Sequence, residues 1–186
     1  MEGVEHTFAG PGKNPAVPDY PKIPLDIPEY VQHVRAAAVD GSCFICSIVS
    51  GARDDHLVVF RDDVCIAFLA KWPTLLGCTL VAPIEHRTDV VGAFTTEEYV
   101  ELQRRVHRIG RAVSAAVPTD RLYLLSLGSQ QGWAHVHWHV APLPPGVPYD
   151  KQQYFALMHE NGYLDVPDSD LAAVAQRIRA LIVNEP

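Results

Sequence analysis

Apolar side chains follow a helical period in the middle of the chain. Between residues 95 and 117 they recur every three or four positions, as in an amphipathic helix with one buried face. Thr95 and Glu98 have the spacing of a capping box, which typically begins such a helix, and Pro118 ends the pattern. The pattern therefore predicts one long amphipathic helix over this stretch.

Other apolar runs are shorter and are bounded by glycine, proline or acidic turn residues, as is typical of strands. The first two are separated only by an Arg-Asp-Asp turn and predict a β-hairpin. The fifth is closed by a proline cluster. The predicted strands lie at residues 56–60, 64–70, 77–83, 121–127 and 133–141.

The two ends of the chain have different patterns. Residues 1–30 contain six prolines, so we expect an extended arm without helix, followed by a short helix over 30–39 and a loop over 41–51. Helices are predicted near 153–160 and over 169–182, the latter capped by Asp168 or Ser169.

These elements predict an α+β fold with a mainly antiparallel sheet, one long amphipathic helix and a C-terminal helical extension. The expected organisation is a Pro-rich arm and short helix over 1–40, a central domain over 41–142, and a helical extension over 143–186 packed on the same domain. With 186 residues and 48% hydrophobic content, the chain has enough apolar material for one core.

Charge and cysteine content narrow the class of protein. Acidic residues outnumber basic ones by 22 to 15, and the basic residues form no run that would follow a phosphate backbone, so a nucleic-acid partner is not expected. No apolar stretch is long enough to span a membrane, and we expect a cytoplasmic location. Cys43 and Cys46 form a C-x-x-C pair, a spacing typical of metal or redox sites in a reducing compartment.

Three histidines alternate with apolar residues near the end of the last predicted strand. On a strand, His135, His137 and His139 would share one face. Grouped imidazoles repel one another when protonated, so this face is expected to meet a metal or an anion. Two uses compete: the imidazoles bind a catalytic Zn²⁺ that activates water, or they form a row along phosphates in which one attacks phosphorus. In the second use, His137 is the natural nucleophile because it has a neighbour on either side.

At this point the sequence resembles the histidine triad (HIT) superfamily of nucleotidyl hydrolases and transferases, whose signature is H-φ-H-φ-H-φ-φ with φ apolar. Residues 135–141 match it in full. "CFICSIVSG" resembles the family's C-x-F-C-x-I opening, "PIEH" ends its third strand, and Gln131 stands four residues before the triad. The resemblance covers about residues 41–142.

The resemblance implies a role for each residue of the triad region. His137 would be the nucleophile that takes the nucleotidyl group from an α-phosphate, and water would hydrolyse the covalent intermediate. His139 would contact the phosphate or the leaving-group oxygen. Gln131 would donate to phosphate oxygens, and Ser126 is the candidate for a further polar phosphate contact.

The zinc-containing branch of the superfamily also implies a role for the C-x-x-C pair. Its metal ligands correspond to Cys43, Cys46, His86 and His135 in this chain. Two thiolates with two imidazoles form a closed tetrahedral set, which suits a structural Zn²⁺ rather than one that activates water.

Two positions depart from the family pattern. Ala70 stands where adenosine-binding members have an Asp or Asn that holds the ribose hydroxyls, and Gly132 stands where many have Ser or Thr. Trp72 and Trp133 are candidates to stack on a base, with a core role as the alternative. His56 and His159 have no such context and are interpreted as incidental.

The resemblance implies an enzyme, a homodimeric nucleotidyl hydrolase that cleaves a small nucleotide at its α-phosphate with no membrane partner. Three alternatives stay open at this stage. They are a transferase of the galactose-1-phosphate uridylyltransferase type, a zinc-water hydrolase or lyase with the triad as metal ligands, and a non-catalytic nucleotide-binding module.

Overall fold

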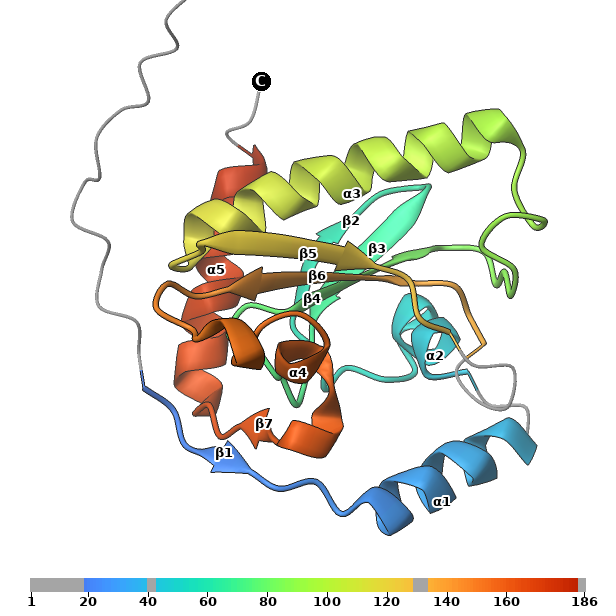
Figure 1. The fold of residues 1–186 in the computed structure, drawn as a ribbon. Helices are drawn as coiled ribbons and strands as arrows, with labels where there is room; N and C mark the ends of the chain where they lie inside the picture. Colours follow the sequence, from blue (N-terminus) through green and yellow to red (C-terminus); the bar gives the residue numbers. More distant parts are fainter. Residues whose placement is uncertain (1–18, 40–42, 129–133, 184–186) are drawn as a thin grey trace, which may run out of the picture.

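A five-stranded antiparallel sheet forms the centre of the molecule, in the order β2-β3-β4-β6-β5 (Figure 1). The structure, a computed structural model, describes residues 19–39, 43–128 and 134–183. The predicted α+β class is confirmed, and every predicted strand forms. The strands are β2 (Val58–Arg61), β3 (Cys65–Leu69), β4 (Thr79–Pro83), β5 (Arg121–Leu125) and β6 (Trp138–Leu143).

One face of the sheet, called here the back face, is covered by two helices, α3 (Thr96–Ala116) and α5 (Asp168–Val183) (Figure 1). The predicted capping box of Thr95 and Glu98 begins α3. Gly110 lets α3 approach the sheet closely, because a Cβ at this position would lie 3.2 Å from the side chain of Leu122. The buried side chains of both helices join those of the sheet in the largest apolar cluster.

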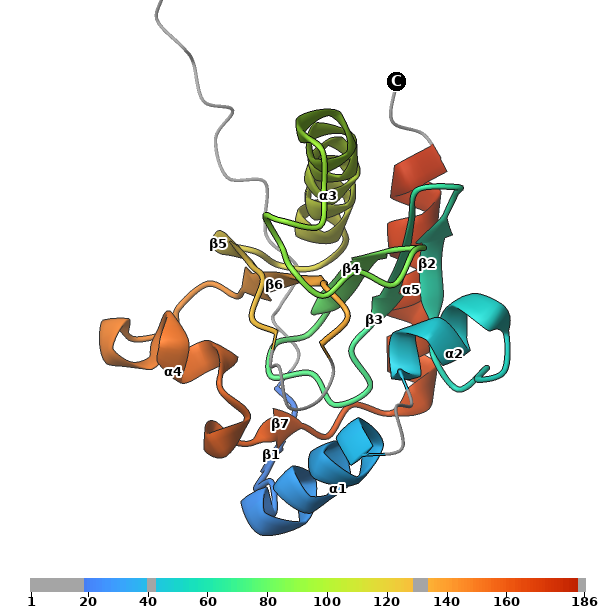
Figure 2. The ribbon, with the colours of Figure 1, turned by 90° about the vertical axis from the view of Figure 1, so that its right-hand side faces the viewer.

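The opposite face, called here the front face, is covered at two separate places. The helix α2 (Phe44–Ser50) packs Ile45 and Ile48 against one part of it. A C-terminal segment covers another part with η1 (Tyr149–Lys151), α4 (Tyr154–Leu157) and η2 (His159–Asn161). Figure 2 shows α2 and α4 on opposite sides of this face.

The N-terminal part of the described chain runs along the edge of this arrangement (Figures 1 and 2). The strand β1 (Lys22–Ile23) pairs antiparallel with β7 (Tyr163–Leu164), so segments from the two ends of the chain are hydrogen-bonded to each other. The helix α1 (Ile27–Val39) follows β1. No helix in the described ranges has the length and apolar character needed to cross a membrane.

Two expectations for the N-terminal half are wrong. The segment 41–51 was expected as a loop, but Cys43 caps the helix α2, and Gly51 ends it with a left-handed φ of 78°. Helix was excluded before residue 30, but α1 already begins at Ile27. Pro28 is tolerated in the first turn, where no intrahelical N–H bond is lost, and Asp26 accepts a hydrogen bond there from the amide of Glu29.

Three elements nearer the C-terminus also differ from expectation. The last helix begins at Asp168, and the carbonyl of Pro167 accepts its first amide bonds, so neither Asp168 nor Ser169 serves as the cap. Regular pairing of β6 starts only at Trp138, three residues after the first triad histidine. The helix expected near 153–160 is reduced to the short α4 followed by η2.

Candidate active site and metal centre

The triad segment keeps its alternation even where it is not paired as a strand. Val136, Trp138 and Val140 are buried in the cluster beneath α3 and α5. His137 and His139 lie on the other side, with ring centroids 4.9 Å apart. Because successive side chains of an extended chain point to opposite faces, the apolar residues fix the two imidazoles on the front face.

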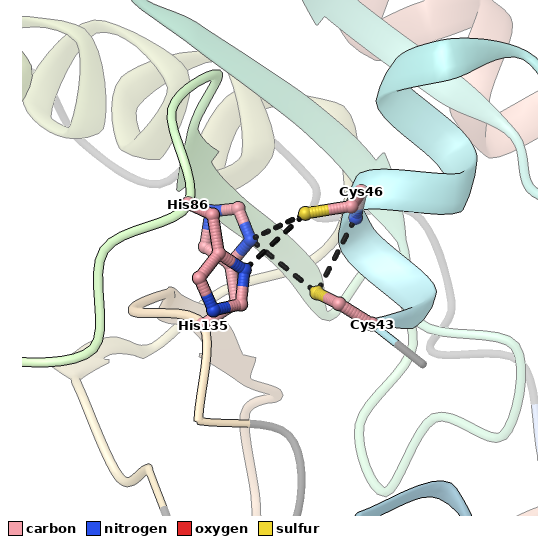
Figure 3. Close-up of side chains that lie close together, drawn as sticks. All are labelled: Cys43, Cys46, His86 and His135. Atoms are coloured by element: carbon pink, nitrogen blue, oxygen red, sulfur yellow. Dashed lines mark hydrogen bonds between the residues drawn. The ribbon is translucent and has the colours of Figure 1, made fainter. Parts of the chain in front are cut away.

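His135 is turned toward the cysteine pair at the start of α2 (Figure 3). Its Nδ1 atom lies 3.5 Å from Sγ of Cys43 and 3.5 Å from Sγ of Cys46. His86, from the loop after β4, has Nδ1 3.3 Å from Sγ of Cys46. Segments far apart in the sequence thus bring together the four residues that were predicted to bind a metal.

The local structure explains why these four side chains converge. Cys43 is the cap of α2 and Cys46 lies in its first turn, where the Cys43 thiol accepts the amide of Cys46 at 3.4 Å. Nε2 of His135 donates to the carbonyl of Pro83 at 3.0 Å. This bond leaves Nδ1 as the lone-pair nitrogen that faces the thiols.

The geometry fits a closed zinc site. With Zn–S near 2.3 Å and Zn–N near 2.0–2.1 Å, a tetrahedron places sulfur and nitrogen roughly 3.5 Å apart. The sulfur–nitrogen distances of 3.3–3.5 Å match this value. Burial and the neighbouring Cys43 raise the pKa of Cys46 to about 11, so a cation at this position would have to hold the Cys46 thiolate ionised.

His137 is held in one tautomer by the backbone. Its Nδ1 atom donates to the carbonyl of His135 at 2.8 Å, so Nε2 is the nitrogen with the lone pair. The imidazole is only 6% exposed, and burial lowers its pKa, which favours the neutral form. Ser126 donates its hydroxyl to the carbonyl of His137 at 2.8 Å. Ser126 thus contacts the triad backbone directly, and its contact with a phosphate stays a prediction.

His139 faces a cleft of about 770 Å³ on the front face of the sheet. Burial, together with the nearby His137 and His159, lowers the pKa of His139 to about 4. A neutral imidazole donates through one nitrogen and accepts through the other. The volume lies within the range of small-molecule sites.

The floor of the cleft is a continuous strip of cross-strand partners. Phe68 pairs with Leu80, and Leu80 pairs with His139. The wall is supplied by α1, by α2 and by residues 157–160. The cleft therefore opens between the two elements that cover the front face, and His139 is part of its floor.

The sequence predicted only some of the residues that line this cleft. Ala70, at the position that the family pattern associates with the ribose, lines it, and so does Trp72, one of the two candidates for stacking on a base. His56 and His159 also line it and are not incidental: His56 packs edge-on against Phe68 with centroids 5.4 Å apart, and Nε2 of His159 donates to the carbonyl of Trp72 at 3.0 Å. Neither residue carries a motif, so only the fold could place it. Gln131, Gly132 and Trp133 lie outside the described residues.

Comparison with known proteins connects this geometry to a family. No family model matches the chain. A curated relative, an uncharacterized HIT-like protein of Saccharolobus solfataricus, is 33% identical over 103 residues, which cover 54% of this chain and 73% of the relative. The chain belongs to the histidine triad family. The HIT signature over residues 135–141 and the expected HIT-like fold are thereby confirmed.

Solved structures agree with this assignment. A hypothetical histidine triad nucleotide-binding protein from Sulfolobus tokodaii is 25% identical, with a TM-score of 0.62 over 76% of this HIT chain and 93% of its own. A zinc-bound histidine triad family protein from Mycobacterium smegmatis is 24% identical, with a TM-score of 0.60 over 76% and 94% of the two chains, and shows the same fold.

Proposed function

We propose that this HIT protein is a nucleotidyl hydrolase that cleaves a nucleotide at its α-phosphate through a covalent intermediate on His137. The observation that carries the proposal is the bond from Nδ1 of His137 to the carbonyl of His135, which leaves Nε2 as the nucleophilic nitrogen. His139 lies beside it and lines a cleft of suitable size.

The proposed reaction has two steps. In the first, the lone pair of Nε2 of His137 attacks the α-phosphorus, and the bond from phosphorus to the leaving-group oxygen breaks. His139 donates a hydrogen bond to the phosphate or to the leaving oxygen. In the second, water attacks the same phosphorus, the P–N bond breaks, and the nucleoside monophosphate leaves with a hydroxyl from water.

We also propose that Zn²⁺ binds the four-residue cluster and has a structural role. Four protein ligands leave no open position for water, so the ion would hold the start of α2 to the triad segment. Within the described ranges, the only grouping of three or more side chains able to hold a metal is Cys43, Cys46, His86 and His135. His137 is outside this grouping, which disfavours the zinc-water hydrolase or lyase.

The substitution His137→Asn tests the hydrolase proposal. We expect kcat to fall at least about a thousandfold because the nucleophile is lost, while nucleotide binding persists. Release of nucleoside monophosphate from a panel of adenylylated and guanylylated compounds measures this. His107→Asn, an exposed histidine on α3, is the matched control and should keep full activity. Full activity in the His137→Asn variant would overturn the proposal.

Two alternatives are separated by the products of the same assay. A transferase would release a sugar-linked nucleotide when a sugar phosphate is added, whereas a hydrolase gives the monophosphate with or without it. A non-catalytic module would bind nucleotides without turning any of them over. The fixed tautomer of His137 favours catalysis over the module, because binding alone does not require a lone pair at Nε2.

A homodimer is also proposed. The strand β5 pairs with β6 on one side and with no other strand of the described chain. Leu124 in β5 is 50% exposed, and Leu127, two residues after its end, is 52% exposed. Exposed apolar groups at an unpaired edge favour a second copy as the partner. Sedimentation at micromolar concentration should give a mass near twice 20.5 kDa, and a monomer would contradict this.

A further inference from the structure

The cleft contains a charged cluster that the proposed chemistry does not use. Oδ2 of Asp55 accepts from Nζ of Lys71 at 2.6 Å. The other oxygen, Oδ1, lies 2.9 Å from Nδ1 of His56 and 3.4 Å from Nε of Arg53. All four residues line the cleft. They come from the loop between α2 and β2 and from the end of β3.

This cluster lies at the end of the cleft away from the triad. Neighbouring strands are about 4.8 Å apart, so the row from His139 through Leu80 to Phe68 spans roughly 10 Å. His56 stands edge-on against Phe68, beyond that row. If the α-phosphate lies at His139, a nucleoside that extends along this floor comes within reach of Asp55.

The floor between these two ends offers few polar groups. Ala70 has no polar side chain, and its amide is already bonded to the carbonyl of Cys78 at 2.8 Å. Lys71, the next residue, sends its ammonium group to Asp55 instead. Lys71 thereby holds the carboxylate of Asp55 near the end of β3, where Ala70 supplies no carboxylate of its own.

The Asp55 carboxylate is accessible and charged. Its side chain is 41% exposed, and that of Lys71 is 45% exposed. The hydrogen bond from Lys71, assisted by His56, lowers the pKa of Asp55 to about 2, so the group is ionised at neutral pH. A carboxylate has about four acceptor sites, so three protein donors leave capacity for a donor from a ligand.

We infer that Asp55, positioned by Lys71, accepts hydrogen bonds from the nucleoside part of the substrate and fixes it in the cleft. The inference rests on the proposed function, since it requires a nucleotide in this cleft. A nucleoside has such donors in two places, the ribose hydroxyls and the amino or imino groups of the base. Both would meet the same acceptor, and the experiment separates them.

Equilibrium binding of nucleoside 5′-monophosphates tests the inference without turnover. The tightest of the adenosine, guanosine, cytidine and uridine monophosphates is measured with the wild type, Asp55→Asn and Lys71→Met. We expect Kd to rise about tenfold or more in Asp55→Asn, since an ionised acceptor is lost, and by less in Lys71→Met. Asp54→Asn is the matched control, because Asp54 is exposed and does not line the cleft.

Two analogues identify the donor. One lacks both ribose hydroxyls, and the other has its base donor removed or methylated. The analogue that lacks the donor group bound by Asp55 should have the same Kd for the wild type and for Asp55→Asn. Thermal unfolding checks that the variants are folded. Because the ion pair between Asp55 and Lys71 is exposed, its loss is expected to change the unfolding temperature little.

The outcomes separate the two proposals. If the wild type binds monophosphates and Asp55→Asn changes Kd no more than Asp54→Asn does, the Asp55 inference is overturned and the proposed function stands. If the wild type binds none of the four monophosphates, the proposed function is overturned and the Asp55 inference falls with it.

Discussion

The two faces of the sheet differ in what their side chains do. The back face is closed by α3 and α5 over a continuous apolar cluster that includes Val106, Val140 and Ile178. The front face is only partly covered and contains the cysteine–histidine cluster, the triad imidazoles and the cleft. The back face is therefore expected to contribute to stability through apolar packing alone, whereas the front face is expected to hold the metal and the ligand.

The triad segment joins the two faces. Val136, Trp138 and Val140 anchor it from behind, and the histidines between them are fixed in front as a result. A dry, well-packed back face thus positions the imidazoles. Substitutions outside the triad segment and the zinc cluster should therefore change the property of one face and leave that of the other unchanged. The zinc cluster is expected to affect both stability and the triad.

The largest loss of stability is expected from substitution in the zinc cluster of the front face, which consists of Cys43, Cys46, His86 and His135. Cys43→Ser keeps an oxygen to cap α2 but removes a metal ligand, so it isolates the contribution of the metal. We expect zinc content to fall from one ion per chain toward none, and the free energy of unfolding to drop by about 4 kcal/mol or more. Metal analysis and thermal unfolding measure both.

The control for this substitution is Cys65→Ala, which alters a buried thiol that is not a ligand. It should retain one zinc per chain. Retention of the metal in Cys43→Ser, combined with its loss in His137→Asn, would contradict the assignment of ligands and favour a metal held by the triad.

A smaller decrease in the free energy of unfolding is expected for substitutions on the back face. Ile178 on α5 is fully buried in the apolar cluster, so Ile178→Ala should lower the free energy of unfolding by about 3 kcal/mol. Leu181→Ala on the same helix, where the side chain is 36% exposed, should cost much less. Denaturant unfolding measures both. A change in nucleotide affinity in Ile178→Ala would break the distinction between the two faces.

Asp62, in the hairpin turn beside α3, should contribute to the free energy of unfolding in a pH-dependent way. Burial alone would raise the pKa of Asp62, but the amides of Cys65 and Val64 and the guanidinium of Arg105 outweigh it and lower that pKa. Asp62→Ala should therefore lower the free energy of unfolding by about 1–2 kcal/mol at pH 7. Because the folded pKa is the lower one, this contribution is present above the unfolded pKa, near 3.9, and is lost as pH falls through the folded value.

The free energies of unfolding of the wild type and Asp62→Ala should therefore approach each other as pH falls, and unfolding measured from pH 7 to pH 3 tests this. Asp63→Ala, one residue further and exposed, should stay close to the wild type throughout. A constant difference over the whole pH range would mean that Asp62 acts through packing rather than through its charge.

The sequence predicted the features that depend on local spacing. The period of α3, its capping box and the strand positions follow from patterns within one segment. The four candidate zinc ligands were predicted as well, because their types and spacing resemble one family. The helix α2 was missed, since its cap is a cysteine and its short apolar run has no clear helical period.

The cleft was not predictable in the same way. Asp55, Lys71 and His159 have no motif, and only the packing of the sheet, the loop before β2 and the C-terminal segment brings them together. The C-terminal helix was expected to pack on the domain, but its sequence did not show which side chains it would meet, and α5 supplies part of the main apolar cluster. Contacts between distant segments decide both features, and no local pattern encodes them.

The most direct test of the proposed function is the mass of the peptide that contains His137 after the protein is mixed with a candidate nucleotide and quenched within one expected turnover. The account predicts that this peptide gains the mass of one nucleotidyl group, and that His137→Asn gains none. Turnover of the same substrate without any such adduct on His137, or with the adduct on another residue, would contradict it.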